Sequence, residues 1–504
     1  MMNMNQPKVD IKYTKMFINN EWTDAVSKKT MPVTNPSTGK SIAQVAEGDK
    51  PDIDKAVQAA KMAFSTGSEW RMMDASKRGH MMMKLADLME RDIKELAMME
   101  SMNNGKPVDM AMIDMQLSVN TMRYYAGWAD KIHGDTIPSD GPLVTMTVKE
   151  PVGVVGQIIP WTYPVLMLVW KWGPALATGC TIVMKPAEQT PLTALMMAAL
   201  AKEAGFPKGV INVVTGMGPT AGHALAMHPD VMKIAFTGSN EVGHLVMEAA
   251  AKSNLKKVTL ELGGKSPMVV FDDVNVDEAV AMAHKAVFMN QGQTCCGGTR
   301  TFVHEKIYDE FVKKATEMAK ARKVGNPFDN GVQQGPQVDQ ETLDKITKMV
   351  ETGKKEGAKL MTGGKRIGTT GYFFEPTVFA DVTDNMTIAK EEIFGPVQAI
   401  MKFSKMEEVI RRANMTHFGL AAGVMTNDIN RAMMFTHLVK AGTVWVNTYN
   451  YLVPQMPFGG YKESGMGRDL GKESLEEYLE TKSILIQMPK KMTEMMKMMT
   501  MNEH

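Results

Sequence analysis

The chain has 504 residues, about three domains at roughly 150 residues each, and its 44% hydrophobic and 22% charged content excludes a disordered or fibrous protein. Lysine and arginine number 57 against 56 acidic residues, and the net charge of +1 gives no electrostatic footprint for nucleic acid or an acidic membrane surface. The methionine content is abnormally high. The 50 methionines exceed the 42 glycines, although methionine is not among the residues that dominate ordinary proteins.

The cysteines and the N-terminus indicate the compartment. Only Cys180, Cys295 and Cys296 are present, and two of them are adjacent, so a disulfide framework is excluded and a reducing interior is expected. The first ten residues are polar and lack the apolar core of a secretory signal. The most apolar stretch, 158–170, is interrupted by two prolines and is shorter than a membrane helix of about 18 residues. We therefore expect a soluble, cytoplasmic protein.

In chain order, residues 52–100 predict two helices, because apolar residues recur there at helical spacing. In residues 137–158, apolar and polar residues alternate, and turn-forming residues interrupt the alternation. This pattern predicts a hairpin arm that could reach another subunit. From residue 181 strands and helices alternate, as is typical of a parallel sheet with helices on its faces. A second alternation over 300–450 predicts a second α/β domain, and residues 476–488 predict a strand.

A carboxylate and a thiol form the strongest chemical pattern. Glu261 ends an apolar stretch and is followed by two glycines, and Cys295 lies 34 positions later in a glycine-flanked segment. A thiol in such a loop is a candidate nucleophile, and a carboxylate across a cleft is a candidate base for water. The alternative is that each is structural, since a buried cysteine is commonly a small hydrophobe.

Both segments, LELGGKSP at Glu261 and FMNQGQTCCGG at Cys295, closely resemble signatures of the aldehyde dehydrogenase family, most similar to its class 1 and 2 branch. Further matching segments run in order along residues 15–488. They are PWTYP at 160–164, MKPAEQTPLTAL at 184–195, FTGS at 236–239, GPQVD at 335–339, KEEIFGP at 390–396 and PFGGYKESGMGRDLG at 457–471.

The resemblance implies an α/β fold with a Rossmann-type NAD-binding domain, an α/β catalytic domain and a β-hairpin oligomerisation arm. The implied boundaries are 1–132 and 152–263 for the NAD-binding domain, 133–151 and 479–490 for the arm, 264–478 for the catalytic domain, and 491–504 for a methionine-rich tail. The arm and the terminal strand imply self-association, as a homotetramer.

The resemblance also implies the chemistry. Cys295 takes the role of the nucleophile that attacks an aldehyde, hydride passes to a nicotinamide, and Glu261 takes the role of the base that activates water against the thioester. Cys296 is interpreted as a packing residue. No His or Cys spacing typical of a metal site occurs, so no metal is expected.

The implied cofactor is NAD. Lys185 and Glu188 would hold the adenosine ribose, and a carboxylate there would repel a 2′-phosphate, which favours NAD over NADP. The remaining implied cofactor-binding residues are Ile158, Trp161, Gly218, Gly238, Ser239, Glu392 and Phe394, with the glycines and Ser239 at helix starts beside the pyrophosphate. The implied substrate tunnel contains Tyr163, Leu166, Met167, Trp170, Leu452 and Phe458, for which ordinary core packing is the alternative.

Thr162 departs from the family pattern, which has asparagine at this position of PWTYP. The asparagine amide helps to hold the oxyanion formed by thiolate attack. Threonine is shorter and β-branched and cannot place a donor where the amide nitrogen was. Loss of one oxyanion donor costs roughly 10²–10³ in rate. The alternative is that Thr162 reaches the oxyanion through a water or a shifted backbone.

Methionine enrichment suggests a use other than catalysis. Many methionines occupy helical positions that suit leucine equally well, but others crowd the polar tail. A polarizable thioether raises the refractive index of a concentrated solution. Together with Thr162, this makes the sequence resemble the omega-crystallins, cephalopod lens proteins related to aldehyde dehydrogenases. The leading hypothesis is therefore a structural lens protein with little or no activity. The alternative is an active NAD-dependent enzyme that oxidises aldehydes to carboxylic acids.

Overall fold

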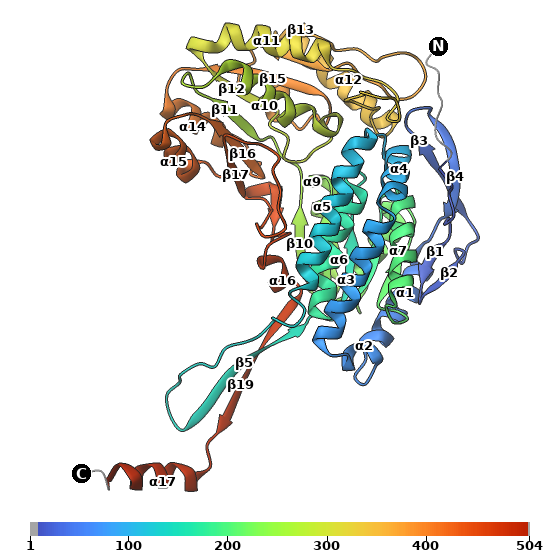
Figure 1. The fold of residues 1–504 in the computed structure, drawn as a ribbon, viewed down its shortest axis with the longest axis vertical. Helices are drawn as coiled ribbons and strands as arrows, with labels where there is room; N and C mark the ends of the chain where they lie inside the picture. Colours follow the sequence, from blue (N-terminus) through green and yellow to red (C-terminus); the bar gives the residue numbers. More distant parts are fainter. Residues whose placement is uncertain (1–8, 502–504) are drawn as a thin grey trace.

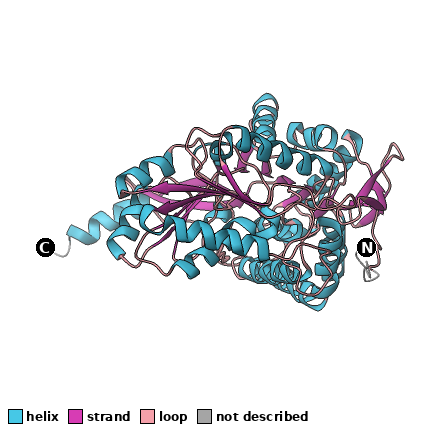
Figure 2. Ribbon diagram, turned by 90° about the horizontal axis from the view of Figure 1, so that it is seen from above, coloured by secondary structure: helices cyan, strands magenta, loops and turns pink. Residues whose placement is uncertain are grey.

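A computed structural model describes residues 9–501 of the chain (Figure 1). Residues 1–8, on which part of the targeting expectation rests, and the last three residues of the tail lie outside the described residues. Two sheets form the centre of the molecule, and helices cover them on either side (Figure 2). None of the helices between residues 9 and 501 combines the length and apolar content needed to span a bilayer.

The first sheet has eight strands in the order β18-β10-β9-β6-β7-β8-β1-β2. The parallel strands are β6 (Val154–Ile158), β7 (Thr181–Lys185), β8 (Ile211–Val213), β9 (Lys233–Thr237) and β10 (Lys257–Glu261), and the edges are β1 (Met16–Ile18), β2 (Glu21–Thr23) and β18 (Gly465–Met466). The chain runs outward from β6 to β8 and then returns to the other side of β6 for β9. Because nucleotides bind where the strand order reverses, the carboxyl ends of β6 and β9 mark the expected cofactor crevice.

The second sheet has seven strands in the order β13-β14-β15-β12-β11-β16-β17. They are β11 (Pro267–Val270), β12 (Arg300–His304), β13 (Lys359–Thr362), β14 (Thr377–Ala380), β15 (Val397–Phe403), β16 (Ala421–Met425) and β17 (Thr443–Val446). Its central strands are buried throughout, as parallel strands covered on both faces must be. The two alternating α/β halves confirm the predicted fold class.

Helices pack on both sheets. Those of the first half are α1 (Lys50–Phe64), α2 (Glu69–Met72), α3 (Ala75–Arg91), α4 (Ile93–Asn104), α5 (Val108–Ala126), α6 (Pro164–Thr178), α7 (Leu192–Ala204), α8 (His223–Met227) and α9 (Asn240–Lys252). Those of the second half are α10 (Val276–Phe288), α11 (Tyr308–Ala321), α12 (Gln340–Lys355), α13 (Thr387–Lys390), α14 (Met406–Asn414), α15 (Ile429–Leu438) and α16 (Glu473–Glu476). The prediction of two helices over 52–100 was too coarse, because the second breaks at Asp92 into α3 and α4.

An arm projects from the body, and it differs from the predicted hairpin (Figure 1). Strand β5 (Leu143–Pro151) pairs antiparallel with β19 (Leu479–Gln487), more than 300 residues away. The segment after β5 turns at Gly153, which has a left-handed φ of 126°, and β6 enters the core instead. The predicted hairpin within 137–158 therefore forms only in part. The Ile137 amide donates to the Thr145 carbonyl at 3.1 Å across the first turn, but β6 does not pair with β5, because its buried residues belong to the first sheet. Beyond the arm, the tail forms helix α17 (Lys490–Met501), and a two-stranded ribbon of β3 (Thr30–Asn35) and β4 (Lys40–Ala46) lies near the N-terminus.

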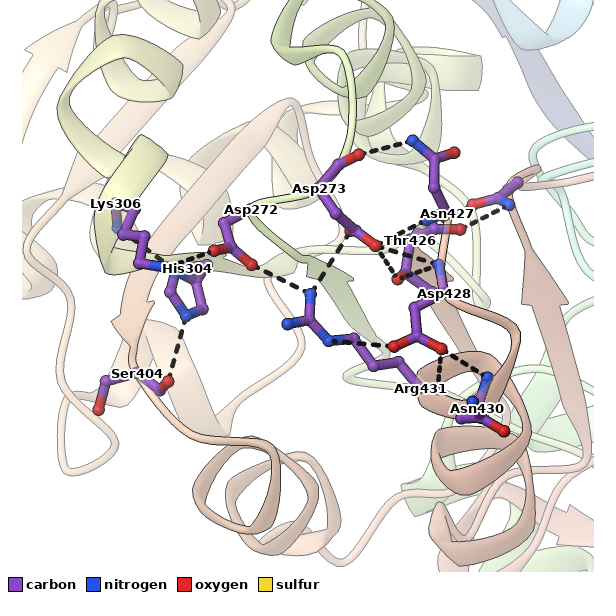
Figure 3. Close-up of polar contacts among 11 residues, drawn as sticks. Asp272, Asp273, His304, Lys306, Ser404, Thr426, Asn427, Asp428, Asn430 and Arg431 are labelled. Atoms are coloured by element: carbon purple, nitrogen blue, oxygen red, sulfur yellow. Dashed lines mark hydrogen bonds and ion pairs between the residues drawn. The ribbon is translucent and has the colours of Figure 1, made fainter.

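A polar cluster fastens the carboxyl edge of the second sheet (Figure 3). Asp273 follows β11, and its Oδ2 accepts hydrogen bonds from Thr426 Oγ1 at 2.8 Å and from the backbone amides of Asn427 and Asp428 at 3.0 Å. Arg431, on α15, donates to Asp272 at 3.0 Å. These contacts tie β11 to the loop between β16 and α15, at the point where the strand order of this sheet reverses.

Candidate active site

A cavity of about 1500 Å³ lies between the two halves of the molecule. Eight of the predicted site residues lie on its wall: Thr162, Trp161, Gly238, Ser239, Glu261, Cys295, Glu392 and Phe394. The six residues expected in a substrate tunnel, Tyr163, Leu166, Met167, Trp170, Leu452 and Phe458, line the same cavity. Segments from both sheets therefore meet around one space.

The loop that carries Cys295 is held in an unusual conformation. Asn290, Gln291 and Gly292 all have left-handed backbone angles, with φ of 50°, 60° and 73°, and two non-glycine residues in this region store strain that the surroundings must support. Asn290 supplies part of that support, because its Nδ2 donates to the carbonyls of Thr162 and Gln293 at 3.0 Å. The loop is thus fastened to the strand-to-helix connection opposite.

Glu261 faces Cys295 directly. It ends β10, and its Oε1 accepts a hydrogen bond from Cys295 Sγ at 3.2 Å. Burial raises the pKa of Glu261 to about 7, and the charge of Asp469 acts in the same direction, while Lys171 opposes it. A carboxyl with a pKa near neutrality can accept a proton and return it at ordinary pH, which is the property that a general base requires.

The thiol of Cys295 is protonated in this resting arrangement. Hydrogen bonding with Cys296, burial and the negative charge of Glu261 raise its pKa well above the ordinary value. Within this contact, Glu261 is the group placed to take the thiol proton, and its transfer would give the thiolate, the nucleophilic form of cysteine. The neighbouring Cys296 is buried and directs its thiol to Asn450 at 3.4 Å.

Four predicted cofactor residues lie just beyond this cavity, on the same edge of the first sheet. Ile158 pairs with Lys185 across β6 and β7, and Lys185 Nζ donates to Glu188 Oε2 at 3.1 Å and to the Gly216 carbonyl at 2.9 Å. Burial alone would raise the pKa of Glu188, but the charge of Lys185 and backbone amides, including that of Gly218, outweigh it and lower the pKa. Glu188 is therefore an anionic hydrogen-bond acceptor.

At two positions on this edge, neighbouring atoms lie too close to the backbone for a residue with a Cβ atom. A Cβ at Gly238 would lie 2.4 Å from the ring of Phe236, and one at Gly263 would lie 2.6 Å from Glu392 Oε2. Ser239 caps α9 by accepting a hydrogen bond from Val242 at 3.3 Å, so the helix start faces the cavity. Such a start suits a phosphate.

Glu392 and Phe394 approach from the second half of the molecule. Glu392 Oε1 accepts a hydrogen bond from the Gly264 amide at 3.0 Å, which joins the segment after β10 to the segment before β15. The Phe394 ring contacts Trp161 edge to face, with ring centres 5.4 Å apart. Together they close the side of the cavity between the cofactor edge and Cys295.

Thr162 lies on the cavity wall and is almost fully buried. Its carbonyl accepts hydrogen bonds from Asn290 at 3.0 Å and from Asn104 at 3.4 Å. Its backbone is therefore fixed from two sides, which favours a fixed hydroxyl position over a shifted backbone.

Sequence reasoning missed three residues around the reacting pair. Lys171 and Asp469 form a buried ion pair at 3.1 Å and act on the pKa of Glu261 from opposite directions. A single charge in the apolar stretch 164–178 was an available signal for Lys171, whereas Asp469 lay within the matched segment 457–471 without any signal that it approaches Glu261. Thr294, next to the nucleophile, bonds to Tyr163. Within residues 9–501, no group of three or more His, Cys, Asp or Glu side chains is arranged to hold a metal ion.

Comparison with known proteins identifies the family. The sequence model of the Aldehyde dehydrogenase family matches residues 22–484, so the chain belongs to the aldehyde dehydrogenase family. It is 59% identical over 486 residues to retinal dehydrogenase 2 of Rattus norvegicus, covering 96% of this chain and 94% of the rat protein. It is 58% identical over 482 residues to aldehyde dehydrogenase, cytosolic 1, of Mus musculus, covering 95% and 96%.

A solved structure agrees with these relatives. The NAD⁺ complex of aldehyde dehydrogenase from Bacillus cereus superposes with a TM-score of 0.93 at 48% identity, covering 95% of this chain and 97% of that chain. Its fold is therefore shared over nearly the full length.

The hypothesis of a lens crystallin with little or no activity is wrong, because relatives at 58–59% identity are named as dehydrogenases. The structure supplies the physical reason. Met82, Met122, Met184 and Met268 are completely buried in the core, where methionine substitutes for leucine at nearly constant volume. For these buried methionines the enrichment is a packing-neutral exchange, and it carries no information about catalysis.

Proposed function

We propose that this protein is an NAD-dependent aldehyde dehydrogenase that oxidises aldehydes to carboxylic acids. One observation carries the proposal: Cys295 Sγ donates to Glu261 Oε1 at 3.2 Å on the wall of a cavity that extends to the cofactor edge of the first sheet. A nucleophile and its base are thus in contact, beside the place where a parallel sheet binds a nucleotide.

The residues of the chain divide the reaction into two halves. Glu261 accepts the Cys295 proton, and the thiolate forms a C–S bond with the aldehyde carbon, which leaves an oxyanion near the Cys295 backbone amide and the Thr162 hydroxyl. When bound, NAD supplies the hydride acceptor that turns this adduct into a thioester. Glu261 first releases the Cys295 proton to solvent, and it then takes a proton from water as the water oxygen bonds to the carbonyl carbon. The C–S bond breaks, the acid leaves, and the Cys295 thiolate takes its proton back from Glu261.

The cofactor edge fits NAD. The anionic Glu188 would accept hydrogen bonds from ribose hydroxyls and would repel a 2′-phosphate. Its carboxylate lies 3.8 Å from where a Cβ of Gly218 would stand, so Gly218 is a direct neighbour of Glu188 on this edge. Lys185 and Ile158 would form the adenosine end with Glu188. Gly218, Gly238 and Ser239 would approach the pyrophosphate, and Trp161, Glu392 and Phe394 would enclose the nicotinamide end.

The tunnel supports an apolar substrate. Met167, Trp170, Leu452 and Phe458 line it, and such a lining favours an aldehyde with a hydrocarbon body. The rat relative is named as a retinal dehydrogenase, and the proposed substrate class is accordingly apolar aldehydes.

The arm supports self-association. Val144 and Ile486 pair across its two strands and are 41% and 50% exposed, and β-ribbons with exposed apolar pairs join other chains readily. We propose a homotetramer built through this arm (133–151 and 479–490), with an NAD-binding domain of 1–132 and 152–263, a catalytic domain of 264–478 and a tail of 491–504. The mouse relative is named cytosolic, which supports a cytoplasmic location.

The test is NADH formation from NAD and a series of short and long apolar aldehydes. Cys295→Ser should abolish turnover, and Glu261→Gln should lower both the initial NADH burst and the steady rate, because thiolate formation and thioester hydrolysis lose the same base. Cys180→Ser is the matched control, since Cys180 is a buried thiol away from the cavity, and it should retain activity. Absence of NADH formation by the unmodified protein, or full activity of Cys295→Ser, contradicts the proposal.

A further inference from the structure

Tyr163 connects the wall of the cavity to the nucleophile loop. Its hydroxyl lies 2.7 Å from Thr294 Oγ1, and Thr294 donates its only hydroxyl proton to the Met289 carbonyl at 3.4 Å. Tyr163 is therefore the donor to Thr294. The two contacts span the loop from Met289, where it begins, to the residue directly before Cys295.

A buried cluster of charged side chains packs against the ring of Tyr163 and fixes its position. Lys106 Nζ lies 4.2 Å from the ring centre and forms ion pairs with Asp114 at 2.6 Å and Glu100 at 3.5 Å. All three side chains are nearly or completely buried. A desolvated ammonium over an aromatic face is strongly attracted to it, so the cluster holds the ring in place.

The backbone of Tyr163 is fixed as well. Its carbonyl accepts the first hydrogen bond of α6, from Met167 at 2.9 Å, and Glu100 Oε2 accepts from the Val165 amide at 3.3 Å. The Tyr163 hydroxyl is thus a donor at a fixed point, pointed at a loop whose conformation is strained at Asn290 and Gln291.

We propose that Tyr163 is a positioning residue for the nucleophile: through Thr294 it holds the 289–295 loop so that Cys295 Sγ stays in contact with Glu261. The inference rests on the proposed function, in which that contact starts the reaction. Misplacement of a reacting group by about 1 Å costs up to 10²-fold in rate, so one fixed hydrogen bond beside the nucleophile has a measurable effect.

The test compares the full-length protein with Tyr163→Phe, Thr294→Val, their combination and Thr294→Ser. Each of the first two should lower kcat about 10-fold, with the KM for NAD unchanged. The combination should be no slower than either single variant, because all three lack the same bond. Thr294→Ser keeps the hydroxyl and should retain most of the activity, which a purely steric role of threonine would not give.

Two controls separate positioning from stability and from the proposed function. Tyr308→Phe removes a hydroxyl that bonds to the Asp381 amide at 2.8 Å, away from the cavity, and should leave kcat unchanged. The rate of Cys295 alkylation by iodoacetamide needs no turnover, and it should fall several-fold in Tyr163→Phe because the thiol loses its base. Additive effects in the combination, or unchanged alkylation and kcat, overturn the positioning role, whereas absence of NADH formation by the parent with slower alkylation in the variant overturns the proposed function alone.

Discussion

Thr162 lies on the cavity wall, where the resemblance led us to expect asparagine, and its side chain sets the first prediction. Thr162→Asn should raise kcat, on the order of 10- to 100-fold, because an amide reaches further than a hydroxyl toward the oxyanion. Steady-state NADH formation measures this, and calorimetric titration with NAD should give an unchanged Kd.

The converse result would be informative. An unchanged kcat in Thr162→Asn would mean that the Thr162 hydroxyl, held by a backbone that Asn104 and Asn290 fix, already serves as an adequate donor.

The ionisation of Glu261 should make kcat depend on pH. Its pKa is raised to about 7, and a carboxyl acts as a base only when ionised, so kcat should be high above pH 7 and fall as the pH drops through that value. A pH profile of kcat under saturating NAD and aldehyde reports this ionisation.

A substitution at Asp469 tests whether Glu261 is the group that causes this pH dependence. The charge of Asp469 raises the pKa of Glu261, so Asp469→Asn should move the acid inflection of the profile to lower pH. An inflection that stays in place would show that another group controls the profile.

At the scale of elements, the cluster of Figure 3 predicts a change in stability without a change in chemistry. Asp273→Ala removes the acceptor for Thr426, Asn427 and Asp428 and should cost about 2 kcal/mol. Thermal unfolding should show a lower midpoint, with kcat unchanged at moderate temperature.

A surface ion pair supplies the comparison for Asp273→Ala. Glu248→Ala breaks the exposed contact with Lys252 in α9, and exposed pairs contribute little, so its midpoint should stay close to that of the parent. Equal midpoints for the two variants would contradict the role given to Asp273.

Elements dictated by local pattern were predictable, and those that depend on distant pairing were not. The alternation of strands and helices gave the two α/β halves, since hydrophobic periodicity is local. The arm required β5 to pair with β19, and no local signal selects a partner so far along the chain. Cys295 and Glu261 were found through motifs, whereas Asp469 acts on Glu261 from 208 positions further along the sequence, a proximity created only by folding.

For the whole molecule, the arm predicts an assembly that one substitution weakens. Ile486→Asp places a carboxylate on the exposed apolar pair with Val144 and should reduce the molecular mass measured by light scattering. Met62→Asp, at a methionine 65% exposed on α1, should leave the mass unchanged. A parent protein that is already monomeric, or an Ile486→Asp variant of unchanged mass, would contradict the role of the arm.

The methionines differ in their exposure to oxidants. Met492, Met495 and Met499 of α17 are 48–62% exposed, whereas Met184 and Met268, in the central strands, are fully buried. Peroxides convert accessible thioethers to polar sulfoxides. Oxidative damage should therefore accumulate on surface methionines, among them those of the helix at the far end of the arm, while the packing of the buried central strands persists.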